Sequence, residues 1–249
     1  MKNPTMRPSD GSVSLCPGIP EKRRKMAVNT HDMVVVHRAF RREFGLLPRM
    51  VTGVFADDGR RVRIVHDHAR EMVSALHHHH QGEDELLWPK LHERAPSQAG
   101  PLRRMETDHA QISALLDAVE LALPAWAQAP TTSATVELAA LFDEISSQLA
   151  AHLAEEEEQL LPVAAERLSP PEWAELGRRG MASMPRSRSL VFLAHILEEA
   201  SPDEARVFLG HLPPPVRVLY RLVGKPRHRR ETAHQRAGID VALASRGTR

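Results

Sequence analysis

The sequence predicts an all-α protein, built as an antiparallel four-helix bundle with a C-terminal extension of short helices. Apolar residues recur at helical spacing through residues 29–168, and no useful stretch alternates with the period of two that marks a strand. Two passages in that region repeat one pattern at one spacing, as two similar helical hairpins would. The chain has 249 residues, of which 42% are hydrophobic, which is enough for one sizeable core and an appendage.

The helices of the bundle follow from the apolar spacing and from local start and stop signals. Thr30 is suited to cap the first helix, and Pro89 is expected to bend the second because its ring removes a backbone donor. A linker over residues 96–101 separates the two hairpins. The helices are expected over residues 30–51, 57–93 and 102–123, and from the end of a connection at 129–133 to residue 168.

The N-terminal residues 1–28 differ in character from the bundle. They are rich in Pro, Ser and Gly and end in a charged run, so we expect them to be disordered. Met26 stands just before the first helix and is an alternative translation start to Met1. The bundle itself is expected to occupy residues 29–168.

Beyond the bundle, residues 169–225 are expected to form a helical extension. Capping boxes with an early proline begin at Ser169 and Ser201, and they predict short helices near residues 173–179 and 203–211. Residues 226–249 are expected to be a basic, disordered tail. Such a tail is able to touch nucleic acid or anionic lipid. Without an aromatic platform or a recognition motif a solvated end is the favoured interpretation, so no nucleic acid is expected as a partner.

The repeated pattern is a His-x-x-x-Glu pair with a proline ten residues after the histidine. It occurs first with His79 and Glu83, and again with His152 and Glu156. Side chains four residues apart share one face of a helix, so each pair aims an imidazole and a carboxylate at one point. Each pair is therefore half of a metal site.

A lone histidine precedes each pair at a nearly constant distance. His37 lies 42 residues before His79, and His109 lies 43 residues before His152. Two such hairpins, packed about a pseudo-twofold axis, place four imidazoles and two carboxylates in the bundle core. Without a ligand each of these groups would carry a desolvation cost on the order of kilocalories per mole. A shared metal is therefore favoured over satisfied core histidines.

These passages resemble the hemerythrin-like, or HHE cation-binding, proteins, and among them the actinobacterial type. The resemblance covers roughly residues 29–168 and lies in HDMVVVHRAF, LHHHHQGEDELLWPKL, METDHAQISALL and LAAHLAEEEEQLLP. It implies a four-helix bundle holding a non-haem di-iron centre, oxo- or hydroxo-bridged, that meets oxygen, nitric oxide or peroxide. The metal ligands carried over by motif are His37, His79, Glu83, His109, His152 and Glu156.

The chain departs from the oxygen-carrying hemerythrins at two positions. Those proteins have a second histidine one turn after the one on the third helix, where this chain has Ser113. They have an aspartate on the last helix, where this chain has Glu156. The chain is thus similar to the more symmetric bacterial and regulatory members, and dedicated oxygen transport is not expected. Fewer protein donors also leave more of the iron open to water or a small ligand.

The run of four histidines at residues 77–80 leaves the register of the second helix to be decided. Successive residues turn through about 100°, so only one of the four is expected to point squarely at the bundle axis. His79 is favoured because its neighbours on that face are apolar and Glu83 follows one turn later. His80 with Asp84 is the competing register. The neighbours of His79 in the run are interpreted as outer donors to the metal site or as solvated side chains.

The donor set points to iron as the cofactor. Imidazole with carboxylate and no thiolate suits iron, manganese or zinc. Two glutamates that are able to bridge favour a redox pair over a structural zinc site, which is usually tetrahedral and rich in sulfur. Two iron ions are therefore expected. The only tyrosine is Tyr220, so no phenolate ligand is expected from within the bundle.

Three functions are compatible with such a site. The favoured one is binding or sensing of a small diatomic ligand, oxygen or nitric oxide, or of peroxide. The second is a peroxide-decomposing, catalase-like oxidoreductase, for which Glu157, His78 or His80 would be the general acid. The third is a metal-stabilised interaction scaffold that works through its tail. Ligand binding is favoured because no site for an organic substrate is recognisable in the sequence.

Composition limits the cellular setting of the chain. A formal net charge of +1 says little about partners, and no protein partner is indicated. No apolar run approaches the length of a membrane span, and the first thirty residues lack the apolar stretch of a secretory signal. The single cysteine, Cys16, excludes an internal disulfide framework and suits a reducing compartment. A cytoplasmic location is therefore expected.

Overall fold

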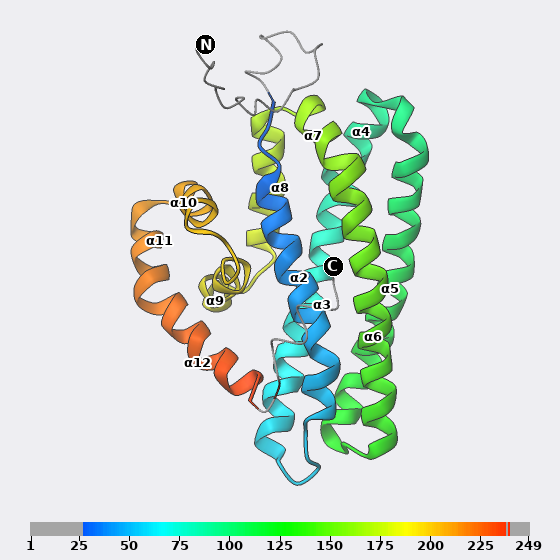
Figure 1. Ribbon diagram of the computed structural model, residues 1–249, viewed down its shortest axis with the longest axis vertical. Coiled ribbons are helices and arrows are strands. Elements are labelled where there is room, and N and C mark those ends of the chain that lie inside the picture. The colour runs from blue at the N-terminus through cyan, green and yellow to red at the C-terminus, as the bar shows by residue number, and fades with distance from the viewer. Residues whose placement is uncertain (1–26, 238, 240–249) are drawn as a thin grey trace, which may run out of the picture.

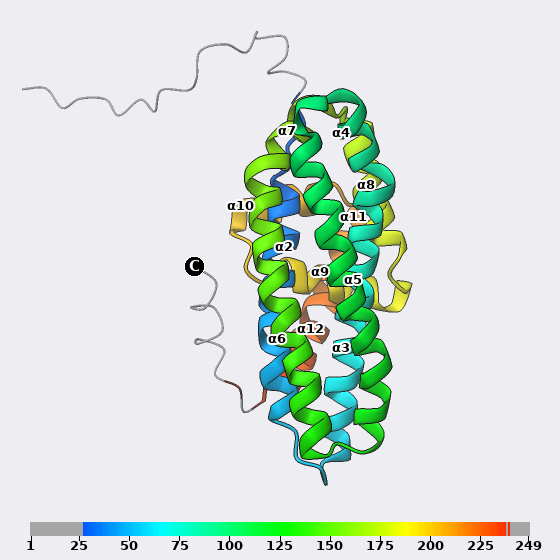
Figure 2. The same ribbon diagram turned by 90° about the vertical axis from the view of Figure 1, so that its right-hand side faces the viewer.

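The computed structural model describes residues 27–237 and 239, and every element within them is a helix. The four long helices of the bundle are α2 (His31–Thr52), α3 (Gly59–Leu86), α5 (Ala99–Gln128) and α6 (Thr132–Glu155). They run alternately up and down, each beside the next in chain order, and α6 returns to lie beside α2 (Figures 1 and 2). The predicted all-α, antiparallel bundle is confirmed.

Two apolar clusters fill the bundle, one on each side of the predicted metal ligands. On α2, for example, Met33 belongs to one cluster and Phe40 to the other, and His37 lies between them. On α5, Met105 and Ile112 flank His109 in the same way. Because each helix places its ligands at the same level, the polar groups form one layer between two apolar regions.

The first hairpin is interrupted close to Pro89, as the sequence predicts. α3 ends at Leu86, and α4 (Trp88–Arg94) follows with the proline in its first turn. Proline has no N–H to donate to the carbonyl four residues earlier, so the regular helical ladder does not continue through it. A short 3₁₀ turn, η1 (Pro96–Gln98), then leads into α5.

The second hairpin has a break that the sequence does not predict. A continuous helix to residue 168 is expected, but α6 passes into a π-helical turn, η2 (Glu156–Leu160), before α7 (Leu161–Arg167). Pro162 in the first turn of α7 again explains why the regular ladder is interrupted. The π turn begins at a predicted metal ligand, and π turns are frequent at functional sites.

The C-terminal extension lies on one side of the bundle, against α2 and α3 (Figure 1). Its elements are α8 (Pro170–Ala182), α9 (Arg186–Ile196), α10 (Pro202–Gly210), α11 (Pro214–Leu219), the π-helical turn η3 (Tyr220–Gly224) and α12 (Lys225–Gln235). Both predicted capping boxes form, from Ser169 to Glu172 and from Ser201 to Glu204. A third apolar cluster, which includes Val35 of α2, joins the extension to the bundle.

The predicted disorder of residues 226–249 is wrong for the first part of that range. Residues 226–235 belong to α12, and His228, Thr232 and Gln235 are buried there. Arg236, expected in the solvated tail, instead pairs with the buried carboxylate of Glu43 and with the exposed Glu198. Sequence reasoning fails here because α12 has no apolar stripe and is held by polar contacts to other elements. Cys16 and Met26 lie outside the described residues, as do residues 1–26 of the predicted N-terminal segment and residues 238 and 240–249 of the predicted tail.

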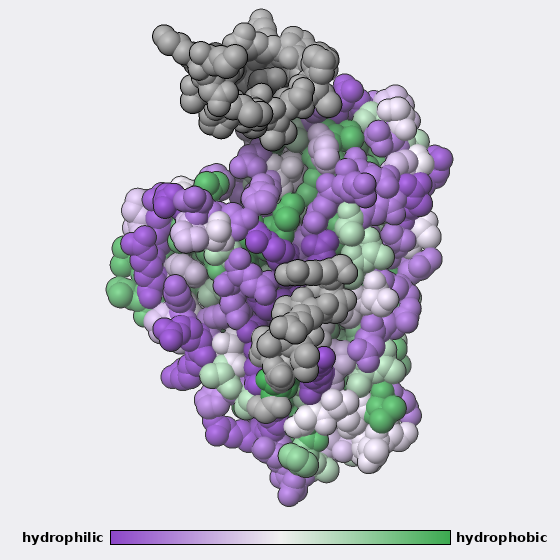
Figure 3. Space-filling view, in the orientation of Figure 1, coloured by the Kyte–Doolittle hydropathy of each residue, from purple (hydrophilic) through white to green (hydrophobic). Residues whose placement is uncertain are grey.

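The face of the molecule drawn in Figure 3 is mainly hydrophilic, with apolar side chains at its left edge. In that region Val218 and Leu219 of α11 and Leu222 and Val223 of η3 are at least half exposed. None of the described helices combines the length and the apolarity needed to span a bilayer.

Candidate metal centre

The six predicted ligands converge in the polar layer of the bundle. They are His37 of α2, His79 and Glu83 of α3, His109 of α5, His152 of α6 and Glu156 at the start of η2. The His79 side chain retains 10% exposure, and the other five residues are exposed by no more than 4%. All four bundle helices thus contribute, as two equivalent hairpins would require.

Four of these residues form one compact group, which we call the mixed group: His37, His79, Glu83 and Glu156. Each offers one donor atom within 4.8 Å of the others. His37 Nε2 lies 3.4 Å from Glu156 Oε2, and His79 Nε2 lies 3.3 Å from Glu83 Oε1. Neither these two ring nitrogens nor any of the four carboxylate oxygens has a hydrogen-bond partner among the described residues.

A second group, the three-histidine group, consists of His80, His109 and His152, whose donor atoms also lie within 4.8 Å of one another. His109 Nε2 is 3.1 Å from His152 Nε2, and the His80 ring stacks on that of His109 at 4.1 Å. Glu83 Oε2 lies 3.5 Å from His109 Nε2. Because Glu83 Oε1 belongs to the mixed group, this one carboxylate spans both groups.

The expectation that only one histidine of the 77–80 run points into the core is wrong. His79 reaches the mixed group and His80 the three-histidine group, and His80 is only 5% exposed. Successive residues of a helix are rotated by about 100°, so His79 and His80 leave α3 in different directions. Each direction leads to one of the two donor groups. His80 thus supplies a third imidazole to the three-histidine group. In the sequence it was recognisable only as the competing register with Asp84.

The two buried carboxyl groups repel each other. Burial in the apolar bundle raises the pKa of Glu83 well above its ordinary value, and the nearby charges of Glu156 and Asp84 raise it further. Burial also raises the pKa of Glu156. Without a cation, the folded chain therefore favours a protonated carboxyl at this position.

Three histidines of the layer, His79, His80 and His152, are held in the neutral form. Burial lowers the pKa of both His79 and His80 well below 6.5, and the neighbouring imidazoles add to this effect. Burial lowers the pKa of His152 to about 3. A neutral imidazole can offer a ring-nitrogen lone pair, which is the form that binds a metal.

Outer hydrogen bonds fix the orientation of two histidines. His37 donates from Nδ1 to Glu157 Oε1 at 2.9 Å, and Arg41 donates to the same oxygen at 2.8 Å. His109 donates from Nδ1 to Asp84 Oδ1 at 2.7 Å. A histidine that donates a hydrogen bond from Nδ1 has a free lone pair on Nε2, which can bind a metal. Carboxylate partners of this kind are typical of metal-binding histidines. Glu157 thus positions His37.

The donor chemistry fits a bound cation. Buried polar atoms in folded proteins almost always have a partner, and leaving one without a partner costs about 1–3 kcal/mol. Here three imidazole Nε2 atoms and four carboxylate oxygens lack one, all aimed into the same polar layer. Two metal ions, one in each group and sharing Glu83, would satisfy these atoms and neutralise the carboxylate repulsion.

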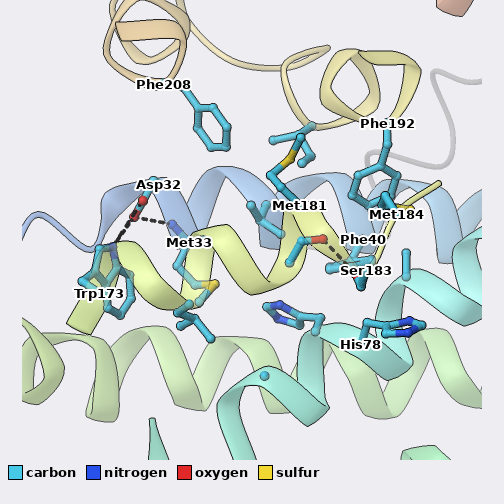
Figure 4. A pocket seen from close by; sticks show the side chains of 18 residues that line it. Asp32, Met33, Phe40, His78, Trp173, Met181, Ser183, Met184, Phe192 and Phe208 are labelled. Carbon is cyan, nitrogen blue, oxygen red and sulfur yellow. Dashed lines mark hydrogen bonds between the residues drawn. The ribbon is translucent and has the colours of Figure 1, made fainter. Parts of the chain in front are cut away.

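An apolar cavity of about 120 Å³ adjoins this layer, between the bundle and the extension. Figure 4 shows Phe40, Phe192 and Phe208 around it, together with Met181 and Met184. His79 of the mixed group and the neighbouring His78 line it as well. The sequence shows no sign of this cavity, because α2, α3, α8, α9 and α10 each contribute only part of its wall.

One comparison with known proteins gives a match. Residues 28–164 match the family model described as the Hemerythrin HHE cation binding domain. No curated protein and no solved structure matches the chain. The matched region contains every residue of the mixed group and of the three-histidine group.

Replacing single histidines of the 77–80 run tests the two groups. We expect His79→Ala and His80→Ala each to weaken metal binding by at least about tenfold, since even partners of metal ligands have effects of that size. His77→Ala is the matched control, because His77 is partly exposed and faces Asp117. The measurement is metal content per chain after dialysis against a chelator. Equal loss of metal in the His77 and His80 variants would mean that His80 is wrongly assigned to a metal-binding group.

Glu83→Gln tests the carboxylate repulsion in metal-free protein. Since the pKa of Glu83 is raised in the folded state, its contribution to stability is present at low pH and is lost as pH rises from about 4.5 through the raised value. The glutamine side chain of the variant does not ionise, so the variant does not lose this stability. Its melting temperature should therefore exceed that of the parent by an amount that grows as pH rises. Each kcal/mol of relief corresponds to roughly 2–4 °C for a chain of this size. A variant that melts below the parent at every pH would contradict the repulsion.

Proposed function

Because the chain belongs to the hemerythrin HHE cation-binding family over residues 28–164, we propose that it holds two iron ions in the bundle and binds or senses oxygen or nitric oxide. The observation that carries the proposal is the pair of buried donor groups joined by Glu83. The donors are nitrogen and oxygen with no thiolate, a set that suits iron. Iron held there would supply a redox-active centre for a diatomic ligand.

The chain's own residues prepare the site for such a ligand. The mixed group offers two imidazoles and two carboxylates, and its His79 lines the apolar cavity, so this group is the better placed to accept an external ligand. The apolar clusters on both sides keep bulk water away from the polar layer. Arg41 and Glu157 hold the His37 ring in one orientation.

The cavity beside His79 favours an apolar diatomic ligand over peroxide. An apolar cavity of roughly 150 Å³ stays dry and takes up xenon or benzene, so the cavity of about 120 Å³ has room for oxygen or nitric oxide. Hydrogen peroxide would have to give up its hydrogen bonds to water in such surroundings. The wall that bounds the cavity comes largely from the extension, which gives that segment a role in ligand entry.

Peroxide decomposition is less well supported by the geometry. A general acid for that reaction has to reach the reacting oxygen atoms. Glu157 Oε1 already accepts hydrogen bonds from His37 and Arg41, and His78 donates from Nδ1 to the Ser74 carbonyl. His80 belongs to the three-histidine group. The three candidate acids are therefore all engaged in other roles.

Metal analysis tests the proposal first. Chain produced with an iron supply should contain about two irons, one for each donor group. After anaerobic reduction, adding oxygen or nitric oxide should change its absorption spectrum, whereas peroxide should not be turned over continuously. One zinc per chain, or no metal, would contradict the di-iron assignment; rapid and sustained peroxide turnover would support the enzyme instead.

Filling the cavity tests the route of the ligand. Gly180 of α8 lines the cavity and is exposed, and an added Cβ would meet no atom within 4 Å. We expect Gly180→Leu to slow nitric oxide binding to the reduced protein several-fold, measured by stopped-flow absorption. The change should not unfold α8, because leucine favours a helix over glycine by about 1 kcal/mol.

Gly210→Leu is the matched control. Gly210 ends α10, its added Cβ would also meet no atom within 4 Å, and it does not line the cavity. This variant should bind nitric oxide at the parental rate. If both variants bind as fast as the parent, the ligand does not pass through the cavity.

A further inference from the structure

The extension contains a further group of metal-type donors that the bundle site does not use, made of two buried histidines and one exposed glutamate. His195 lies in α9, Glu198 follows the end of α9 and His228 lies in α12. Each presents one donor atom within 4.8 Å of the other two. None of the three belongs to the repeated pattern of the bundle, and no motif in the sequence singles them out.

The His195 ring is oriented as a metal ligand would be. Its Nδ1 donates to Oε1 of the buried Glu43 at 3.2 Å, so its Nε2 carries the lone pair. His195 is 1% exposed, and its Nε2 has no hydrogen-bond partner among the described residues. A carboxylate behind the imidazole is the usual support of a metal-binding histidine.

His228 faces the same point from α12. Its ring lies 4.4 Å from that of His195, nearly perpendicular to it, and its Nε2 likewise has no hydrogen-bond partner within the described chain. His228 is 5% exposed. Its Nε2 lies 3.4 Å from Glu198 Oε2. Two imidazole nitrogens and one carboxylate oxygen therefore lie close together, and neither nitrogen has a hydrogen-bond partner within the described chain.

Carboxylates and guanidinium groups pair around the group. The carboxylates of Glu43, Glu198 and Glu199 face the guanidinium groups of Arg42 and Arg236. Arg236 donates from Nη1 to Glu198 Oε1 at 2.5 Å and from Nη2 to Oε2 at 3.0 Å, and Oε2 is also the oxygen 3.4 Å from His228 Nε2. Further basic residues line the cavity beside the group, namely Arg221, Lys225 and Arg229, and a bound cation would compete with them for Glu198.

We propose that His195, His228 and Glu198 bind a divalent cation of the zinc class. Two imidazoles and one carboxylate are a common zinc donor set, completed to four-coordination by a water molecule. A cavity of about 780 Å³ lined by Glu198 and His228 gives that water access from solvent. The absence of cysteine from the group argues against copper(I).

An ion at this position would join α9 to α12 and, through Glu43, tie both to α2. The group shares no ligand with the bundle centre, so the proposal does not depend on iron being bound there. A cation that binds only the folded chain stabilises it by mass action. The ion would thus lock the extension onto the bundle and hold the wall of the apolar cavity in place.

The test is a zinc titration of the iron-loaded full-length chain by calorimetry, with iron content measured before and after. We expect one saturable zinc equivalent per chain without loss of iron. His228→Ala should abolish it. His234→Ala is the matched control, because His234 lies on the same helix and its side chain is exposed. The control should bind zinc like the parent.

A second measurement covers the case in which His228→Ala fails to fold. Cobalt(II) added to the iron-loaded parent should give the visible absorption bands of a four-coordinate ion, and equimolar zinc should remove them. No zinc equivalent in the parent, equal zinc binding by the two alanine variants, or cobalt spectra of a six-coordinate ion would each overturn the proposal.

Discussion

Two carboxylates and five imidazoles are buried in one layer of an otherwise apolar bundle, and the rest of the structure is arranged around that layer. Removing these groups from water is unfavourable unless they have partners. The outward nitrogens of His37 and His109 have carboxylate partners, but many inward atoms have none. The family match over residues 28–164 identifies the missing partner as a cation. On this account, the bundle is a scaffold that tolerates buried charge because a metal neutralises it.

Much of the site could be predicted because its pattern is local. Two His-x-x-x-Glu pairs at helical spacing fix which face of a helix carries donors, and the bundle then brings the faces together. His80 could not be placed from the sequence, because whether it points inward together with His79 depends on how α3 packs against α5. The π turn at Glu156 and the folding of α12 likewise depend on contacts between distant segments. Glu43 was a missed signal, since a charged residue stood within the apolar stripe of α2.

The extension does more than follow the bundle in sequence. Through α8, α9 and α10 it forms part of the wall of the apolar cavity that reaches His79. The polar network around Glu43 holds α9 and α12 against α2. The two features belong together, because a loosely held extension would leave the cavity without one of its walls. The ligand proposed for the bundle and the cation proposed for the extension are linked in this mechanical sense.

The most direct measurement is anomalous X-ray diffraction at the iron absorption edge from crystals of iron-loaded protein. The account predicts two peaks in the bundle. One should lie among His37, His79, Glu83 and Glu156, and the other among His80, His109 and His152, with Glu83 reaching both. A single peak, or peaks away from these residues, would show that the buried donors do not form a paired-metal centre.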